Sequence, residues 1–181
     1  MTESSMTLDP RAYRNTIGLF ATGVTVVTTE VNGEVHGMTA NAVASLSLDP
    51  MLLLVSVGKK AHMAGLLQTT PTFTVNILRA DQESLSTYFA GGWKQPEPPP
   101  FQLVRWEGQP QMGSTRLEDA LAAIACVKYE ILEGGDHWIV IGRVVALHQG
   151  APPHSPILFY GGRYYQLDVT KEHPAPPRRD L

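Results

Sequence analysis

The stretch that decides the fold is GMTANAVASLSLDPMLLLVSVGKKAH, residues 37–62. Small, hydroxylated and amide side chains run through its first half, an apolar strand-like segment follows at residues 51–57, and Lys59 and Lys60 come next. A backbone that carries little bulk lets a flat, hydrogen-bonding ligand come close, and lysines beside the start of a helix can meet an anion. The stretch predicts a binding surface for a planar ligand, with a site for an anionic group at one end. A plain strand with outward-facing serines and solvated lysines is the alternative.

The composition indicates one ordinary globular domain. The chain has 181 residues, of which 43% are hydrophobic and 17% charged, and its formal net charge is -3. Because no basic stripe accompanies that charge, neither a nucleic acid nor an anionic membrane is an expected partner. Its apolar runs are too short to span a bilayer, and the first ten residues lack the pattern of a signal peptide. We therefore expect a cytoplasmic location.

The cysteine and histidine pattern does not predict a metal site. The single cysteine, Cys126, excludes an internal disulfide and a multi-cysteine site, and its apolar neighbours indicate a small core residue. The six histidines show none of the spacings that hold a metal ion. We expect no metal in this protein.

The first forty residues predict a helix followed by a hairpin. Asp9 and Pro10 suit a helix start, and apolar residues at helical spacing extend the expected helix up to Gly23. A strand at residues 24–31 then meets Asn32-Gly33, the strongest short hairpin signal, and a return strand at residues 34–40 follows.

The rest of the chain predicts a mainly β protein. Helices are expected at residues 61–68 and 81–89, the second capped by Asp81, and the proline-rich residues 95–100 indicate an extended insert. Further strands are expected at residues 51–57, 73–78, 101–106, 123–132, 138–148 and 156–167. Many strands joined by short turns, with three helices among them, favour an antiparallel barrel with decorating helices. No glycine-rich dinucleotide or phosphate loop occurs.

Three further segments combine small residues with rings. Gly134-Gly135-Asp136-His137 precedes a strand, so His137 can lie against an aromatic ligand, although a hairpin turn with a surface histidine also fits. The segment FYGGRYY, residues 159–165, is either a hairpin of packing aromatics or one that places a tyrosine against a ligand. The segment FAGGWK, residues 89–94, is either an ordinary glycine cap or a second contact.

These motifs, in this order, resemble one known family. RNTIGLFATGVTVVTTEVNG, VHGMTANAVASLSLDP, LLLVSVGKKAHM, FTVNIL, FAGG, the GDH triplet and PILFYGGRYYQL are similar to the short flavin:NAD(P)H reductases that serve two-component monooxygenases, such as phenol and 4-hydroxyphenylacetate hydroxylases. The resemblance implies an FMN-binding split β-barrel of antiparallel Greek-key type, usually a homodimer. It places that domain at residues 10–168, between a flexible N-terminus at 1–9 and a disordered or partner-draped tail at 169–181.

The resemblance also implies a set of site residues. His137 of the GDH triplet is expected at the nicotinamide, as the catalytic residue. The residues expected to bind flavin, its ring and ribityl chain first and its phosphate side next, are Thr39, Ala40, Asn41, Ser45, Leu46, Ser47, Ser56, Val57, Gly58, Lys60, Ala61 and His62, with Phe89, Ala90, Gly91 and Tyr164 from two later segments. Pro50-Met51 and the segment GGWKQPEPPPF depart from the family pattern, and the second departure reshapes one wall of the site.

The implied activity is transfer of a hydride from NADH or NADPH to FAD or FMN, with reduced flavin diffusing to a separate monooxygenase. Hydride transfer depends mainly on positioning two rings, so the lack of an acid–base dyad agrees with it. Two alternatives stay open: a non-catalytic flavin-binding electron carrier, and a split-barrel oxidoreductase with its own organic substrate. The motifs do not distinguish FAD from FMN, nor NADH from NADPH.

Overall fold

A computed structural model of the chain describes residues 8–108, 114–151, 155–168 and 170–171. Its elements are α1 (Pro10–Ile17), β1 (Thr22–Gly23), β2 (Thr25–Val31), β3 (Glu34–Ala40), β4 (Val43–Leu48), β5 (Met51–Gly58), α2 (His62–Thr69), β6 (Thr72–Ile77), the 3-10 turn η1 (Ala80–Gln82), α3 (Glu83–Phe89), β7 (Leu103–Arg105), β8 (Thr115–Leu117), β9 (Ala122–Gly134), β10 (His137–Gln149), β11 (Ile157–Tyr160) and β12 (Arg163–Gln166).

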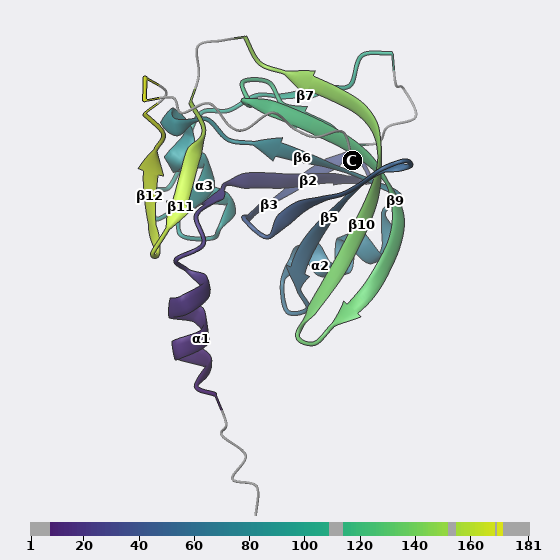
Figure 1. Cartoon of the computed structure of the whole chain (residues 1–181). Helices are drawn as coiled ribbons and strands as arrows, with labels where there is room; N and C mark the ends of the chain where they lie inside the picture. The colour runs from purple at the N-terminus through teal and green to yellow at the C-terminus, as the bar shows by residue number, and fades with distance from the viewer. Residues whose placement is uncertain (1–7, 109–113, 152–154, 169, 172–181) are drawn as a thin grey trace, which may run out of the picture.

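Seven of the strands form one antiparallel sheet that curls into a barrel (Figure 1). Their order is β3-β2-β6-β9-β10-β5-β4. Because β5 pairs with β10 and β6 pairs with β9, the connection through α2 passes the whole β9–β10 hairpin, as in a Greek key. The barrel interior holds Val55, Phe73 and Val140, and α2 adds Met63 and Leu67 to the same core.

A smaller sheet, β1-β11-β12, packs beside the barrel with α3 between them (Figure 1). Val24, Leu78, Leu85 and Ile157 form the core of this junction. α1 lies apart from both sheets and buries none of its residues. The fold therefore leaves an open angle between α1 and the barrel.

The expected hairpin and most expected strands are confirmed. Asn32 and Gly33 both have positive φ, at 52° and 84°, as a tight hairpin turn requires. The strand region expected at 156–167 is a hairpin that turns at Gly161 and Gly162, as the glycine pair predicts. Cys126 is fully buried, and that burial raises the pKa of its thiol to about 12, so it is the expected core residue.

Other expectations about the elements were wrong. The first helix ends at Ile17, not near Gly23. The backbone N–H of Gly161 donates a hydrogen bond of 2.8 Å to the Gly18 carbonyl, and the chain then turns into β1. The N-cap of α3 is Gln82, not Asp81, and the Asp81 carboxylate accepts two hydrogen bonds of 2.9 Å from Arg79, the N-cap of η1. Residues 43–48 form a strand, as the alternative interpretation of the deciding stretch allowed, residues 115–117 form a strand that was not expected, and the strand expected at 101–106 covers only β7.

The described part of the chain contains no helix long and apolar enough to cross a membrane. It also brings together no three histidine, cysteine, aspartate or glutamate side chains that could hold a metal ion. The expected tail lies outside the described residues, apart from residues 170 and 171.

Candidate functional site

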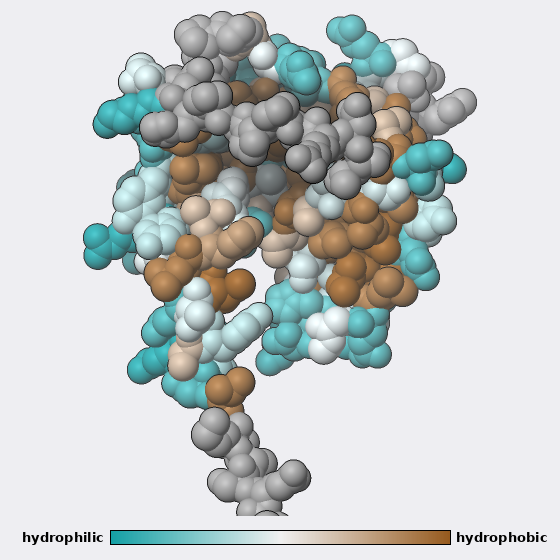
Figure 2. Space-filling view, viewed as in Figure 1, coloured by the Kyte–Doolittle hydropathy of each residue, from teal (hydrophilic) through white to brown (hydrophobic). Residues whose placement is uncertain are grey.

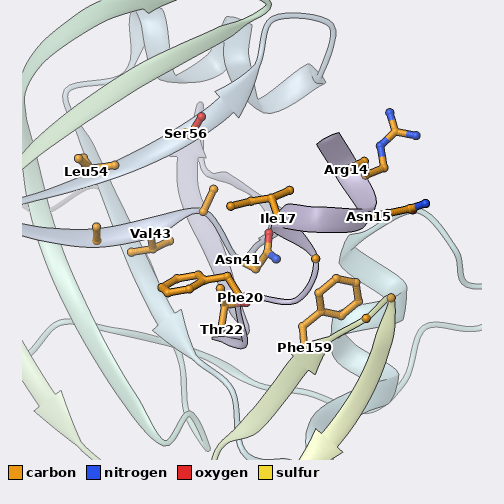
Figure 3. Close-up of a pocket in the computed structure, with 15 residues that line it drawn as sticks. Arg14, Asn15, Ile17, Phe20, Thr22, Asn41, Val43, Leu54, Ser56 and Phe159 are labelled. Carbon is orange, nitrogen blue, oxygen red and sulfur yellow. The ribbon is translucent and has the colours of Figure 1, made fainter. Parts of the chain in front are cut away.

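A cavity of about 800 Å³ lies in the angle between α1 and the outer face of β4 and β5 (Figures 2 and 3). The strand β5 turns Leu53, Val55 and Val57 into the barrel, so the residues between them face this cavity. The residues that line it are Arg14, Asn15, Ile17, Gly18, Phe20, Thr22, Asn41, Ala42, Val43, Ala44, Leu54, Ser56, Phe159, Gly161 and Gly162.

The cavity has apolar walls with a few polar groups among them. Val43, Leu54 and Phe159 supply flat or branched apolar surface, while Asn41 and Ser56 supply an amide and a hydroxyl (Figure 3). This combination is typical of sites for small organic ligands, in which apolar walls give affinity and a few polar groups fix orientation. A planar ring with hydrogen-bonding edges suits it.

Two of the expected flavin residues, Asn41 and Ser56, line this cavity, and the others do not. Ala40 and Val57 are neighbours of these two in sequence, but their side chains belong to the barrel core. Only the main chain of such residues can face a ligand. Ser45 and Ser47 lie farther along β4, where a bulge interrupts the pairing with β5.

The expected contacts Thr39 and Tyr164 instead hold α3 in place. Thr39 Oγ1 donates to the Ser86 carbonyl at 2.7 Å. The hydroxyl of Tyr164 lies 2.7 Å from the fully buried Ser86 Oγ. Both side chains thus use their hydroxyl groups in hydrogen bonds with Ser86 of α3, and these bonds connect β3 and β12 to α3.

The small residue at the start of the deciding stretch serves the protein's own packing. A Cβ on Gly37 would lie 2.4 Å from Cε1 of Phe89, so the ring of Phe89 fills the space that glycine leaves. Phe89 also contacts Phe101 at a centroid distance of 5.3 Å. Ala90 and Gly91 follow it at the exposed end of α3. This segment does not line the cavity.

The expected phosphate end lies at the start of α2. Lys60 and His62 are exposed there, and Ala61 is the N-cap without any side-chain cap for the first amides. Uncapped amides beside a lysine can bind an anion. Lys59 is not available for this, because it forms an ion pair with Glu133 and its Nζ lies 4.6 Å from the ring centroid of Trp138.

His137 is presented at the tip of the β9–β10 hairpin. It pairs in register with Gly58, and a Cβ there would lie 3.6 Å from Nε2 of His137. Its Nδ1 lies 2.7 Å from Oδ1 of Asp136, and this hydrogen bond lowers the pKa of the Asp136 carboxyl. Gly58 and Ser56 are two residues apart on one face of β5, about 7 Å along the strand, so His137 lies near one end of the cavity.

Sequence reasoning missed most of the cavity wall. Asn15, Ile17 and Phe20 come from a segment that reads as an ordinary amphipathic helix and its end. Phe159 and Gly161 belong to the aromatic hairpin, whose glycine pair was the one available signal. The expectation that this hairpin could face a ligand thus finds support in its phenylalanine and glycines, whereas its tyrosines do not line the cavity.

Comparison with known proteins identifies the family. The model of the "Flavin reductase like domain" matches residues 17–168. The reductase subunit of a flavin-dependent monooxygenase, HsaB of Rhodococcus jostii, is 36% identical and covers 96% of this chain and 86% of its own length.

Two solved structures give the same answer. The flavin reductase PheA2 is 44% identical with a TM-score of 0.80, over 88% of this chain and 99% of that one. The NADH:FAD oxidoreductase SgcE6 of Streptomyces globisporus, solved with NAD and FAD fragments, is 35% identical with a TM-score of 0.80, over 93% and 100%. These matches confirm the expected split-barrel fold, and the chain belongs to the flavin reductase like domain family.

Proposed function

We propose that this protein is an NAD(P)H-dependent flavin reductase that transfers a hydride from nicotinamide to FAD or FMN. It supplies the reduced flavin to a separate monooxygenase. The observation that carries the proposal is the cavity between α1 and β4–β5, which has the His137 hairpin at one end. The relatives named as monooxygenase reductase subunits and NADH:FAD oxidoreductases support the same activity. We take residues 10–168 as the flavin reductase domain.

The cavity residues fit a flavin. Val43, Leu54 and Phe159 offer apolar surface to a ring system, and Asn41 and Ser56 offer donors and acceptors to its polar edges. Bound there, the flavin accepts the hydride that the nicotinamide donates. The chain's own residues supply orientation and exclude water from the ring faces, which is most of what this reaction requires.

His137 seats the nicotinamide in this proposal. The ionised Asp136 accepts a hydrogen bond from Nδ1–H, which fixes the orientation of the His137 ring. Gly58 carries no side chain and therefore leaves the Nε2 edge of the ring open. Lys59 and Glu133 hold the hairpin that carries His137 against the end of β5. We assign the phosphate groups of the flavin to Lys60 and His62 beside α2.

We also propose a homodimer. The edge strand β4 and the start of β5 expose Leu46, Leu48 and Met51, and α1 and the segment after it expose Ile17 and Phe20. These apolar side chains belong to the elements that border the cavity, and apolar surface gathers over the β5–β10 side of the barrel (Figure 2). Exposed apolar patches of this kind mark interaction sites, and a second copy would cover them. Light scattering after size-exclusion chromatography tests this: a monomer at micromolar concentration contradicts it.

Anaerobic mixing of the protein with a flavin and a nicotinamide tests the activity. FAD and FMN are each combined with NADH and NADPH, and the loss of flavin absorbance is followed in a stopped-flow instrument. Bleaching without added organic substrate supports a flavin reductase. A protein that binds flavin without bleaching is the electron carrier, and one that bleaches only with an organic substrate is the other oxidoreductase.

The variant His137→Ala tests the assignment within the site. We expect flavin reduction to slow by about tenfold or more, since a misplaced nicotinamide reacts slowly, while the Kd for flavin stays within about twofold. His148→Ala is the matched control, because His148 lies at the far end of β10 from His137 and does not line the cavity. Unchanged reduction in His137→Ala would remove this residue from the reaction.

A cytoplasmic location stays a prediction of the sequence.

A further inference from the structure

Thr22 carries a hydroxyl group that the protein itself does not use. Its Oγ1 is buried and has no hydrogen-bond partner among the described residues. Its neighbours in the same region behave differently. Thr25 Oγ1 donates to the Ala40 carbonyl at 2.6 Å, Thr28 Oγ1 to the Thr115 carbonyl at 2.7 Å, and Thr39 Oγ1 to the Ser86 carbonyl. A buried hydroxyl without a partner destabilises the fold, so one that persists calls for a role.

The position of Thr22 points to that role. It lines the cavity, two residues after Phe20 and directly opposite Phe159 in the β1–β11 pair, and both of these rings line the cavity too (Figure 3). Of the polar groups described so far, Ser56 on β5 lies away from Thr22, and Asn41, which follows β3, lies closer to it (Figure 3). Thr22 is thus a polar group on the side of the cavity that the smaller sheet and the α1 segment form.

The hydroxyl can reach a ligand without a change in the backbone. Thr22 is partly exposed although its Oγ1 is not, so other atoms of the side chain face the cavity. Rotation about Cα–Cβ by one rotamer step exchanges the hydroxyl with another substituent of Cβ. A hydroxyl both donates and accepts, so it suits a carbonyl oxygen or a ring nitrogen equally.

We propose that Thr22 is a flavin-binding residue, whose hydroxyl forms a hydrogen bond with the polar edge of the isoalloxazine ring. The inference rests on the proposed function and adds a residue outside the expected flavin-binding set, although Thr22 lies within the first of the family motifs. The bound ring supplies the partner that the hydroxyl lacks in the free protein. Thr22 therefore contributes to flavin affinity at the expense of the stability of the flavin-free fold.

That opposition makes the proposal testable with Thr22→Val, which keeps the shape and removes the hydroxyl. Thr115→Val is the matched control, because Thr115 Oγ1 is also buried without a partner but lies on β8 and does not line the cavity. The melting temperature of each flavin-free protein is measured, and then the Kd for FAD and for riboflavin by fluorescence titration. Riboflavin carries the ring without phosphate or adenylate.

We expect both valine variants to melt at or above the wild-type temperature, since each removes an unpaired buried hydroxyl. Only Thr22→Val is expected to weaken FAD and riboflavin binding, by about five- to thirty-fold, the loss of one buried hydrogen bond. Thr22→Ser keeps the hydroxyl and should bind flavin within about twofold of wild type.

Three results would overturn the inference. Wild-type affinity in Thr22→Val would show that the hydroxyl makes no contact with flavin. A loss in Thr22→Ser as large as that in Thr22→Val would show that the hydroxyl is not what carries the affinity. A lower melting temperature in flavin-free Thr22→Val would show that the hydroxyl has a partner within the protein. If the wild type binds neither FAD nor riboflavin, the proposed function itself fails, and this is a separate outcome.

Discussion

Replacement of Tyr164 by phenylalanine removes the hydroxyl that joins the smaller sheet to α3. That hydroxyl lies 2.7 Å from Ser86 Oγ, and Ser86 is fully buried. Loss of one neutral hydrogen bond costs about 1 kcal/mol, and the unpaired Ser86 hydroxyl left in the interior adds to that cost. We expect Tyr164→Phe to lower the free energy of unfolding by about 1–2 kcal/mol, which for a chain of this size lowers Tm by about 2–8 °C.

A double-mutant cycle with Ser86→Ala isolates the bond. Unfolding in urea is followed by tryptophan fluorescence at one fixed protein concentration, so that any dimerisation affects all four proteins alike. Because the double variant lacks both partners, it leaves neither hydroxyl unpaired. We expect it to be about 1 kcal/mol more stable than the sum of the single losses indicates.

The same variants decide between two roles for Tyr164. If its hydroxyl anchors α3, Tyr164→Phe loses stability and its Kd for FAD changes by less than about threefold. Additive losses in the cycle would refute the hydrogen bond on which the reasoning depends. A flavin affinity that falls about tenfold in a variant of wild-type stability would place the hydroxyl at the flavin, as the sequence motif implies.

Two further predictions concern the walls of the site. Gly37→Ala places a Cβ against the ring of Phe89, and we expect it to lower the free energy of unfolding, measured in urea, by about 1–3 kcal/mol. The double variant Gly37→Ala/Phe89→Leu should recover part of that loss. An unchanged free energy of unfolding would show that the ring moves freely. Asp136→Asn removes a carboxylate whose pKa is lowered by the hydrogen bond with His137. The ionised carboxylate therefore stabilises the fold above the unfolded pKa of about 3.9, and this stabilisation is lost as the pH falls through the lower folded pKa. The difference in Tm from wild type should therefore begin to shrink as the pH falls below about 4 and vanish once the pH is below the lowered folded pKa, and a difference that grows in acid would contradict this sign.

Most of the fold was predictable because its strands carry local signals. Asn32-Gly33 fixes one hairpin, and the buried runs of β2 and β5 read directly as strands. β4 carried only the weak signal of alternating serine and leucine at residues 45–48, and as an edge strand it leaves both kinds of side chain mostly exposed. The end of α1 was misplaced because Phe20 continues the helical spacing of apolar residues, yet it lines the cavity instead of a helix face.

The candidate site was predictable only in part, because motifs mark residues without saying which atoms face the ligand. Asn41 and Ser56 reach the cavity, but Val57 faces the core and Thr39 is held by Ser86. The α1 side of the cavity could not be found from sequence at all. It depends on the Gly18 segment meeting the distant turn at Gly161, and no local pattern encodes that contact.

This division of the wall bears on how a flavin would be held. The barrel side, β4 and β5, is fixed by ladder hydrogen bonds and a packed core, so Asn41 and Ser56 have defined positions. The opposite side includes α1, none of whose residues is buried. This helix is connected to the rest of the fold through the segment that leads into β1. A wall with so little packing has low local stability and must be ordered when a ligand or a second copy covers it. Ordering opposes binding, so the free energy gained from the ring contacts is partly offset and the flavin leaves more readily. A reductase that hands its product to another enzyme requires this, because a tightly held reduced flavin would never reach the monooxygenase.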